Sequence, residues 1–137
     1  MFKWKDAFSV NVAEIDKQHK KLIEIGSKLA HILSLKDDID HYDEIMEILE
    51  NLKEYTVYHF NYEEELMKKY GFEGLKAHER EHQAFVDKII ELTTKDIDDN
   101  QKKVTMDMLI FIADWIENHI LKTDHKYKDF FNEKGIF

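Results

Sequence analysis

The feature that most constrains the fold of this chain is an apolar repeat of three and four residues that returns in four segments. This spacing places apolar side chains on one face of an α-helix. It predicts helices over about residues 16–33, 41–69, 75–94 and 101–121, with Asp16 as an N-terminal cap and Gly71 ending the second helix. The 137 residues include no proline and only four glycines, so little in the sequence interrupts long helices.

The segments between these helices are short and polar, which favours antiparallel packing of consecutive helices. We therefore expect an all-α, up-down-up-down four-helix bundle that forms a single domain over residues 1–137. The N-terminal arm, up to about residue 14, carries apolar residues without helical spacing and is expected to cross the bundle as an extended segment. The C-terminal tail is predicted to form a short helix, with Phe130 and Phe131 packed back on the bundle.

Charge and composition argue against several classes of partner. The formal net charge is −9 and the lysines are scattered among acidic residues, whereas nucleic-acid binding needs a basic face. The longest uncharged apolar run, residues 108–113, is too short to span a bilayer, and the first residues do not form a signal peptide. The absence of cysteine fits a reducing compartment. We expect a soluble cytoplasmic protein that binds neither nucleic acid nor membranes.

Each predicted helix places at least one histidine on its apolar face, and two acidic residues join these histidines. Burying so many ionisable groups without partners would cost several kcal/mol for each, in a domain with only about 5–15 kcal/mol of stability. A bound cation is the natural compensation, so the sequence predicts a metal site. Its candidate ligands are His19, His59, Glu63, His78, His82, His119 and Asp124.

The composition and number of these ligands narrow the kind of metal site. Imidazole and carboxylate ligands without thiolate suit iron, zinc, copper, nickel or manganese. Seven protein ligands are too many for one four-coordinate zinc ion. Two metal ions bridged by both carboxylates, with five terminal imidazoles and a solvent-derived bridge, leave one coordination position open. A small ligand would bind at that position.

Two other kinds of site share part of this pattern. His78-Glu79-Arg80-Glu81-His82 fits the zinc-protease pattern H-E-x-x-H, with Glu79 as general base, and also its inverse. The pattern is short, however, and a pair buried in a four-helix core leaves no room for a peptide substrate. A ferritin-like di-iron oxidase or peroxidase would need two Glu-x-x-His motifs and two further glutamates. Only Glu79-x-x-His82 fits, and we expect Glu79 and Glu81 to be solvated.

Four stretches together resemble the ligand signature of the hemerythrins, in particular the single-domain bacterial ones. The resemblance extends over nearly the whole chain and every ligand position. It implies a non-haem di-iron centre that binds O2 reversibly for storage, transport, scavenging or sensing, and a protein that is not an enzyme. The stretches are Asp16-Lys17-Gln18-His19, His59-Phe60-Asn61-Tyr62-Glu63, His78-x3-His82 and His119-x4-Asp124.

The resemblance also implies a role for each candidate ligand. Three histidines complete the first iron and two hold the second, which keeps the open position. The two carboxylates bridge the ions together with an oxo or hydroxo group. The implied sets are His78, His82 and His119 for the first iron, His19 and His59 for the second, and Glu63 and Asp124 for the bridges.

An apolar O2 pocket carries over from the family in the same way. Such a pocket must be dry, because water or anions at the open position would displace the ligand and leave the irons oxidised. The residues that correspond to this pocket are Leu22, Phe60, Trp115, Ile116 and Ile120, all of them apolar as the family pattern requires.

Overall fold

A computed structural model describes residues 2–35, 41–93 and 101–137 of the chain, without the side chains of residues 33, 92 and 101–105. The predicted loops fall mostly outside these ranges. Within the described residues there is no strand, and all four predicted helices are present. They are α1 (Ala13–Ser34), α2 (Tyr42–Tyr70), α3 (Leu75–Thr93) and α4 (Gln101–Asn118). Three shorter elements are η1 (Asp6–Phe8), the π-helix η2 (His119–Asp124) and α5 (His125–Glu133).

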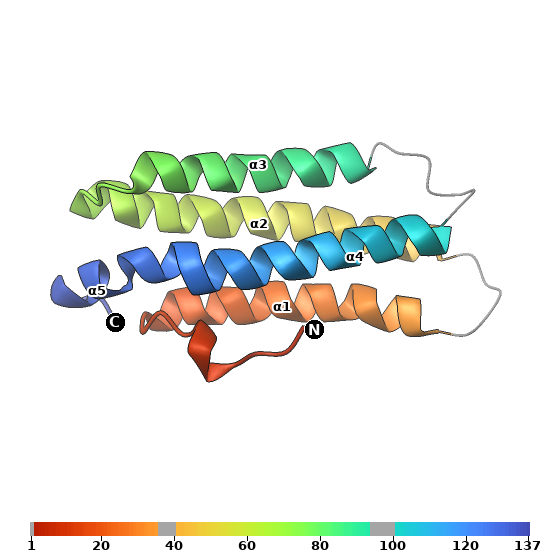
Figure 1. Cartoon of the computed structure of the whole chain (residues 1–137), viewed down its shortest axis with the longest axis horizontal. Coiled ribbons are helices and arrows are strands. Elements are labelled where there is room, and N and C mark those ends of the chain that lie inside the picture. Colours follow the sequence, from red (N-terminus) through yellow and green to blue (C-terminus); the bar gives the residue numbers. More distant parts are fainter. Residues whose placement is uncertain (1, 36–40, 94–100) are drawn as a thin grey trace.

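Consecutive long helices run in opposite directions along the molecule (Figure 1). α1 packs against α2 and α4, and α2 also packs against α3. This arrangement confirms the predicted up-down-up-down four-helix bundle. η2 and α5 continue from α4 at the end of the bundle where α1 and α3 begin (Figure 1).

The interior contains two apolar clusters with a polar layer between them. Leu22 and Phe85 belong to the larger cluster, whereas Ile15 and Phe131 belong to the smaller one, beside α5. His19 lies on α1 between Ile15 and Leu22, at helical spacings of four and three residues, so its side chain enters the layer between the clusters. The buried Phe131 confirms that the C-terminal helix packs back on the bundle.

The start of α1 differs from the prediction. The helix begins at Ala13, and Val12 occupies the capping position, so the prediction of Asp16 as the N-cap was wrong. The Asp16 carboxylate turns back to the arm instead, where it accepts hydrogen bonds from the Val10 backbone N–H at 2.9 Å and the Ser9 hydroxyl at 2.6 Å. It therefore fixes the arm at the point where the arm enters the helix.

The arm is less extended than predicted, because it contains the 3₁₀ turn η1. A Cβ atom on residue 26 would lie only 2.2 Å from the Phe2 ring of the arm. The arm therefore crosses α1 closely at Gly26, where a side chain would not fit. The C-terminal end of α2 is capped by Gly71, which has a φ of +74°. This left-handed conformation confirms the predicted C-terminal cap.

Asp16→Ala should loosen the junction between the arm and α1. The substitution removes two hydrogen bonds to a charged acceptor, for which we expect a loss of about 1–3 kcal/mol in the free energy of unfolding. Urea denaturation of the metal-free protein measures this loss. Lys17→Ala, which changes the exposed neighbour, is the control and should stay within about 0.5 kcal/mol of the parent. Equal unfolding midpoints for the two variants would show that the Asp16 contacts do not stabilise the fold.

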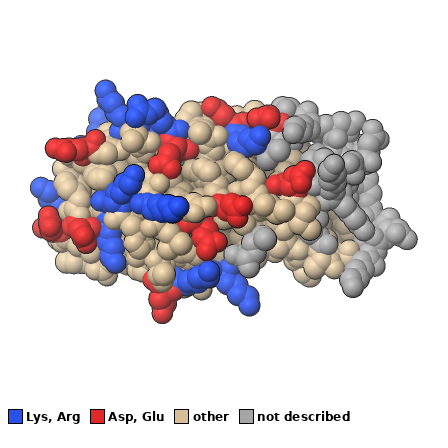
Figure 2. All heavy atoms as spheres, viewed as in Figure 1, with Lys and Arg blue, Asp and Glu red and all other residues tan. Residues whose placement is uncertain are grey.

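The surface carries both signs of charge. Acidic and basic side chains are interspersed over the described part of the face shown in Figure 2. None of the described helices is at once long and apolar enough to cross a membrane.

Candidate metal centre

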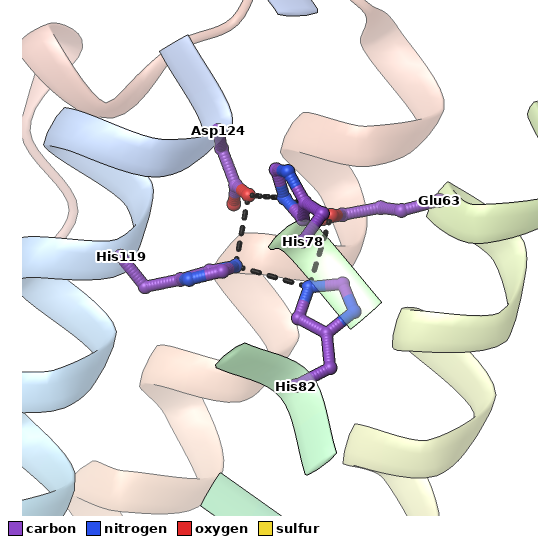
Figure 3. A group of neighbouring side chains, drawn as sticks. All are labelled: Glu63, His78, His82, His119 and Asp124. Atoms are coloured by element: carbon purple, nitrogen blue, oxygen red, sulfur yellow. Dashed lines mark hydrogen bonds and ion pairs between the residues drawn. The ribbon is translucent and has the colours of Figure 1, made fainter. Parts of the chain in front are cut away.

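The seven residues predicted as metal ligands converge in the polar layer of the bundle. Each is at most 4% exposed, although all are ionisable. Three helices of the bundle and the π-helix that follows α4 supply them: His19 from α1, His59 and Glu63 from α2, His78 and His82 from α3, and His119 and Asp124 from η2. Figure 3 shows five of these side chains pointing toward one another.

The seven side chains form two groups that overlap. In each group, one ligand atom from every residue lies within 4.8 Å of the others. One group contains three histidines and the other contains two, and the carboxylates of Glu63 and Asp124 belong to both. This is the grouping that the sequence resemblance implied. The members are Glu63, His78, His82, His119 and Asp124 in the first group, and His19, His59, Glu63 and Asp124 in the second.

Helix geometry explains how the pairs of ligands share a face. His78 and His82 are four residues apart on a regular α-helix, as are His59 and Glu63, so each pair points the same way. His119 and Asp124 are five residues apart, which on an α-helix would turn them about 140° away from each other.

The π-helix η2 has wider turns, so residues five apart lie on nearly the same face of it. His119 Nε2 thereby lies 2.9 Å from Asp124 Oδ1. The periodicity of the sequence predicted a regular α-helix through His119, and the π-helix was not predicted. The spacing of five residues between two inward-facing polar groups was the available signal.

The two carboxylates contact histidines from both groups. Asp124 Oδ1 lies 2.7 Å from His78 Nε2, and its Oδ2 atom lies 3.0 Å from His19 Nε2. Glu63 Oε1 contacts His59 Nε2 and lies 3.2 Å from His19 Nε2, whereas its Oε2 atom is 3.5 Å from His78 Nε2. Each carboxylate therefore occupies the position of a bridge between the groups.

These contacts and burial raise the pKa of two histidines of the centre and lower that of a third. Burial alone would lower the pKa of His19, but close contacts with the carboxylates of Asp124 and Glu63 outweigh it and raise the pKa to about 9. The same causes raise the pKa of His78 to about 9. Burial, together with the charges of His119 and His78, lowers the pKa of His82 to about 3.

The pKa values of both carboxylates are lowered, whereas burial ordinarily raises the pKa of an acid. Burial raises the pKa of Glu63, but the His59 charge and hydrogen bonds to imidazoles bring it well below its usual value. Burial and the Glu63 charge likewise raise the pKa of Asp124, yet the contacts with His119 and His19 lower it overall. Both groups are therefore anions, which is the form that binds metal ions.

Several details of the cluster fit a bound metal better than a purely hydrogen-bonded network. Glu63 Oε2 and Asp124 Oδ2 are buried, and the imidazole nitrogens that lie 3.5 Å and 3.0 Å from them do not approach in a hydrogen-bonding direction, so both oxygens lack a hydrogen bond within the described part of the chain. His82 Nε2 and His119 Nε2 face each other at 3.0 Å, so both nitrogens are directed into the same space. Imidazole nitrogen and carboxylate oxygen are donors that suit iron. The residues present therefore fit a pair of iron ions.

Gln18 supports the centre from outside, a role that was not predicted from the sequence. Its side chain is 1% exposed, and its Oε1 atom accepts a hydrogen bond from His59 Nδ1 at 2.7 Å. The amide nitrogen of Gln18 donates to Glu14 at 3.1 Å, which fixes the orientation of the amide. His59 therefore presents Nε2 to the centre.

The five residues expected to form the O2 pocket lie in the larger apolar cluster. Phe60 stacks on His82, with ring centroids 3.7 Å apart, and Trp115 stacks on His119 at 4.3 Å. Both rings thus cover imidazoles of the three-histidine group. Trp115 is only partly buried and, with His119, lines an open groove of about 360 Å³ on the surface. The buried remainder of the set is Leu22, Ile116 and Ile120.

The two glutamates between His78 and His82 have different surroundings. Glu79 is exposed on α3 and belongs to neither ligand group, so it does not occupy the position of a protease base. Glu81 was expected to be solvated, and its side chain is 44% exposed, but it also makes contacts that were not predicted. Its Oε1 atom accepts a hydrogen bond from the Thr123 hydroxyl at 3.0 Å and lies 3.7 Å from His119 Nδ1.

Comparison with known proteins identifies relatives over nearly the whole chain. The family described as Hemerythrin HHE cation binding domain matches residues 10–131. Bacteriohemerythrin from Clostridium acetobutylicum is 40% identical over 129 residues, which cover 94% of this chain and 100% of that protein. Bacteriohemerythrin from Methylococcus capsulatus is 33% identical and covers 88% of each chain. A crystal structure of wild-type hemerythrin superposes with a TM-score of 0.75 at 32% identity, over 93% of this chain and 95% of the other.

Proposed function

Because this chain belongs to the hemerythrin family, we propose that its seven converging residues hold two iron ions at which O2 binds reversibly. The chain is an oxygen-binding protein, as its family, its structural relative and its ligand cluster together support. The iron pair and the individual ligands are the proposed part of this assignment.

The sharing of two carboxylates between two buried ligand groups is the observation that carries the proposal. Three histidines complete one metal position, whereas only His19 and His59 complete the other, so the second position has room for an additional small ligand. When bound, the iron pair would supply the electrons that O2 accepts, and it would take them back when O2 leaves. The side chains of the protein set the charge, orientation and dryness of the site.

The carboxylates, Gln18 and the apolar side chains each contribute differently to the charge, orientation and dryness of the site. The anionic carboxylates of Glu63 and Asp124, both fully buried, would balance the charge of the cations. Gln18 fixes the ring orientation of His59. Phe60 and Trp115 cover imidazole faces, and the buried aliphatic residues of the predicted O2 pocket keep competing water and anions away.

We also propose that the protein binds O2 without turning it over. Five imidazoles and only two carboxylates give the centre fewer negative charges than a ferritin-like oxidase site would carry. Such a set favours the ferrous state and reversible binding over oxidation to higher valence. A zinc-protease function has no structural support, because Glu79 is exposed and lies apart from the buried centre.

Anaerobic reduction followed by titration with O2 tests this function. We expect about two irons per chain, one for each ligand group, and near-ultraviolet charge-transfer bands from an oxo-bridged ferric pair in the oxidised form. The reduced protein should develop an oxygenated spectrum that disappears when O2 is removed under argon. One zinc per chain, or immediate oxidation without an oxygenated spectrum, would contradict the proposal and indicate a different metal or an enzyme.

A further inference from the structure

The imidazoles of His82 and His119 turn their outer nitrogens toward acidic side chains. His82 Nδ1 lies 3.4 Å from Glu64 Oε2, and His119 Nδ1 lies 3.7 Å from Glu81 Oε1. The Nε2 atoms of the same two rings face each other inside the centre. Each ring therefore reaches from the centre to a carboxylate nearer the surface.

The carboxylate of Glu81 is held in place by the element that carries His119. Thr123 lies on η2, is 7% exposed and donates its hydroxyl hydrogen to Glu81 Oε1 at 3.0 Å. His119 Nδ1 is buried and forms no hydrogen bond of ordinary length within the described residues. Glu81 is the acidic group that faces this nitrogen, and a small closure of the 3.7 Å gap completes a hydrogen bond.

The two-histidine group lacks this arrangement. His59 Nδ1 donates to the neutral amide oxygen of Gln18. His19 Nδ1 is buried and has no hydrogen-bond partner in the described part of the chain. Among the described residues, outer carboxylates thus lie behind two imidazoles of the three-histidine group, whereas the other group has an amide behind His59 and no hydrogen-bond partner behind His19.

A carboxylate behind a metal-binding imidazole has two physical effects. It keeps the proton on the outer nitrogen, so that the inner nitrogen offers its lone pair to the metal, and it makes the ring a stronger electron donor. A stronger donor stabilises the more highly charged metal ion. The outer carboxylates should therefore favour tight metal retention and the ferric state at the three-histidine position.

We propose that Glu81, held by Thr123, is a positioning residue that orients His119 and strengthens it as a metal ligand, and that Glu64 does the same for His82. The inference rests on the proposed di-iron centre. It assigns the two metal positions different outer surroundings, with the three-histidine position held more firmly. The open position for O2 then lies beside the ion whose imidazoles lack such support.

Glu81→Gln tests the inference because it keeps the size of the side chain and removes its charge. In the iron-loaded protein we expect about tenfold faster loss of iron to an excess of chelator. The midpoint potential for reduction of the centre should also move upward, because a weaker ligand favours the ferrous ion. Thr123→Val, which removes only the hydroxyl, should shift both readouts in the same direction by less. Glu64→Gln should also act in the same direction.

Asp87→Asn is the matched control, since it removes an exposed charge from the same helix at a residue that belongs to neither ligand group. It should leave iron retention and midpoint potential unchanged. If Glu81→Gln behaves like this control in both measurements, the positioning role is wrong. Failure of the proposed function would appear separately, as a parent protein that holds no iron pair or that holds one without binding O2.

Discussion

Glu63→Gln should release both metal ions rather than one. The Glu63 carboxylate belongs to both ligand groups and contacts His59, His19 and His78, so no other single side chain on α2 can replace it. Glutamine keeps the shape of the side chain, but its neutral amide is a poor bridge between two cations. Five imidazoles would then share one remaining carboxylate, Asp124, which leaves the buried positive charge largely unbalanced.

Iron analysis after desalting measures this loss. The parent should keep about two irons per chain and Glu63→Gln close to none, while the helical circular dichroism signal stays that of the parent. Glu65→Gln is the matched control, because Glu65 is an exposed neighbour on the same helix and should retain both ions. Retention of a full iron pair by Glu63→Gln would exclude a bridging role for this residue.

His82→Ala provides a contrast within the same experiment. His82 belongs to the three-histidine group alone, so its loss should weaken that position first. The iron content should fall toward one ion per chain, whereas Glu63→Gln affects both ions at once. An equal and complete loss in the two variants would mean that the two positions do not fill independently.

The fold was predictable from the sequence because one periodicity runs through all four helices. Apolar positions that recur every three and four residues determine which face of each helix is buried, and the polar segments between helices determine the antiparallel order. The start of α1 was harder to predict. An aspartate near a helix start usually caps that helix, but the Asp16 carboxylate serves the Ser9–Val10 segment of the arm, a tertiary contact that no local pattern shows.

The candidate ligands were predictable for the same reason, since all of them lie on inward faces. Two features of the site could not be predicted in this way. A π-helix depends on the widening of one turn, so the sequence shows it only through the five-residue spacing of His119 and Asp124. The outer partner Glu81 meets Thr123 across a separation of 42 residues, which only the packing of α3 against η2 can reveal. Helical periodicity identifies the buried face, but it does not identify which surface carboxylates bend toward that face.

Metal uptake by the metal-free protein should release protons from two particular histidines. His19 and His78 have a pKa raised to about 9 despite burial, because Asp124 and Glu63 bind their protonated forms. Both rings are therefore protonated at neutral pH, and a metal ion can bind their Nε2 atoms only after these protons leave. His82, with a pKa of about 3, is already neutral and releases none.

The sign of the pH dependence follows from these shifts. A raised histidine pKa stabilises the metal-free fold fully below the unfolded value of 6.5, and this contribution is lost as the pH rises through about 9. Metal affinity changes in the opposite direction. Each displaced proton should increase the apparent affinity for the ion that replaces it about tenfold per pH unit, and so the affinity for the complete pair about a hundredfold, while both rings are protonated. The increase should level off above pH 9.

Anaerobic titration of the metal-free protein with ferrous iron in weakly buffered solution at pH 7.5 measures the released protons directly. We expect at least the two protons of His19 and His78 per filled centre. Chemical denaturation at pH 6.5 and pH 9 should show that the metal-free protein loses stability with rising pH. His31→Gln, an exposed position on α1, should release the same number of protons as the parent. Binding of iron without proton release at pH 7.5 would show that the ring protons are not held as the structure indicates, and that the carboxylates do not pair with charged imidazoles before the metal arrives.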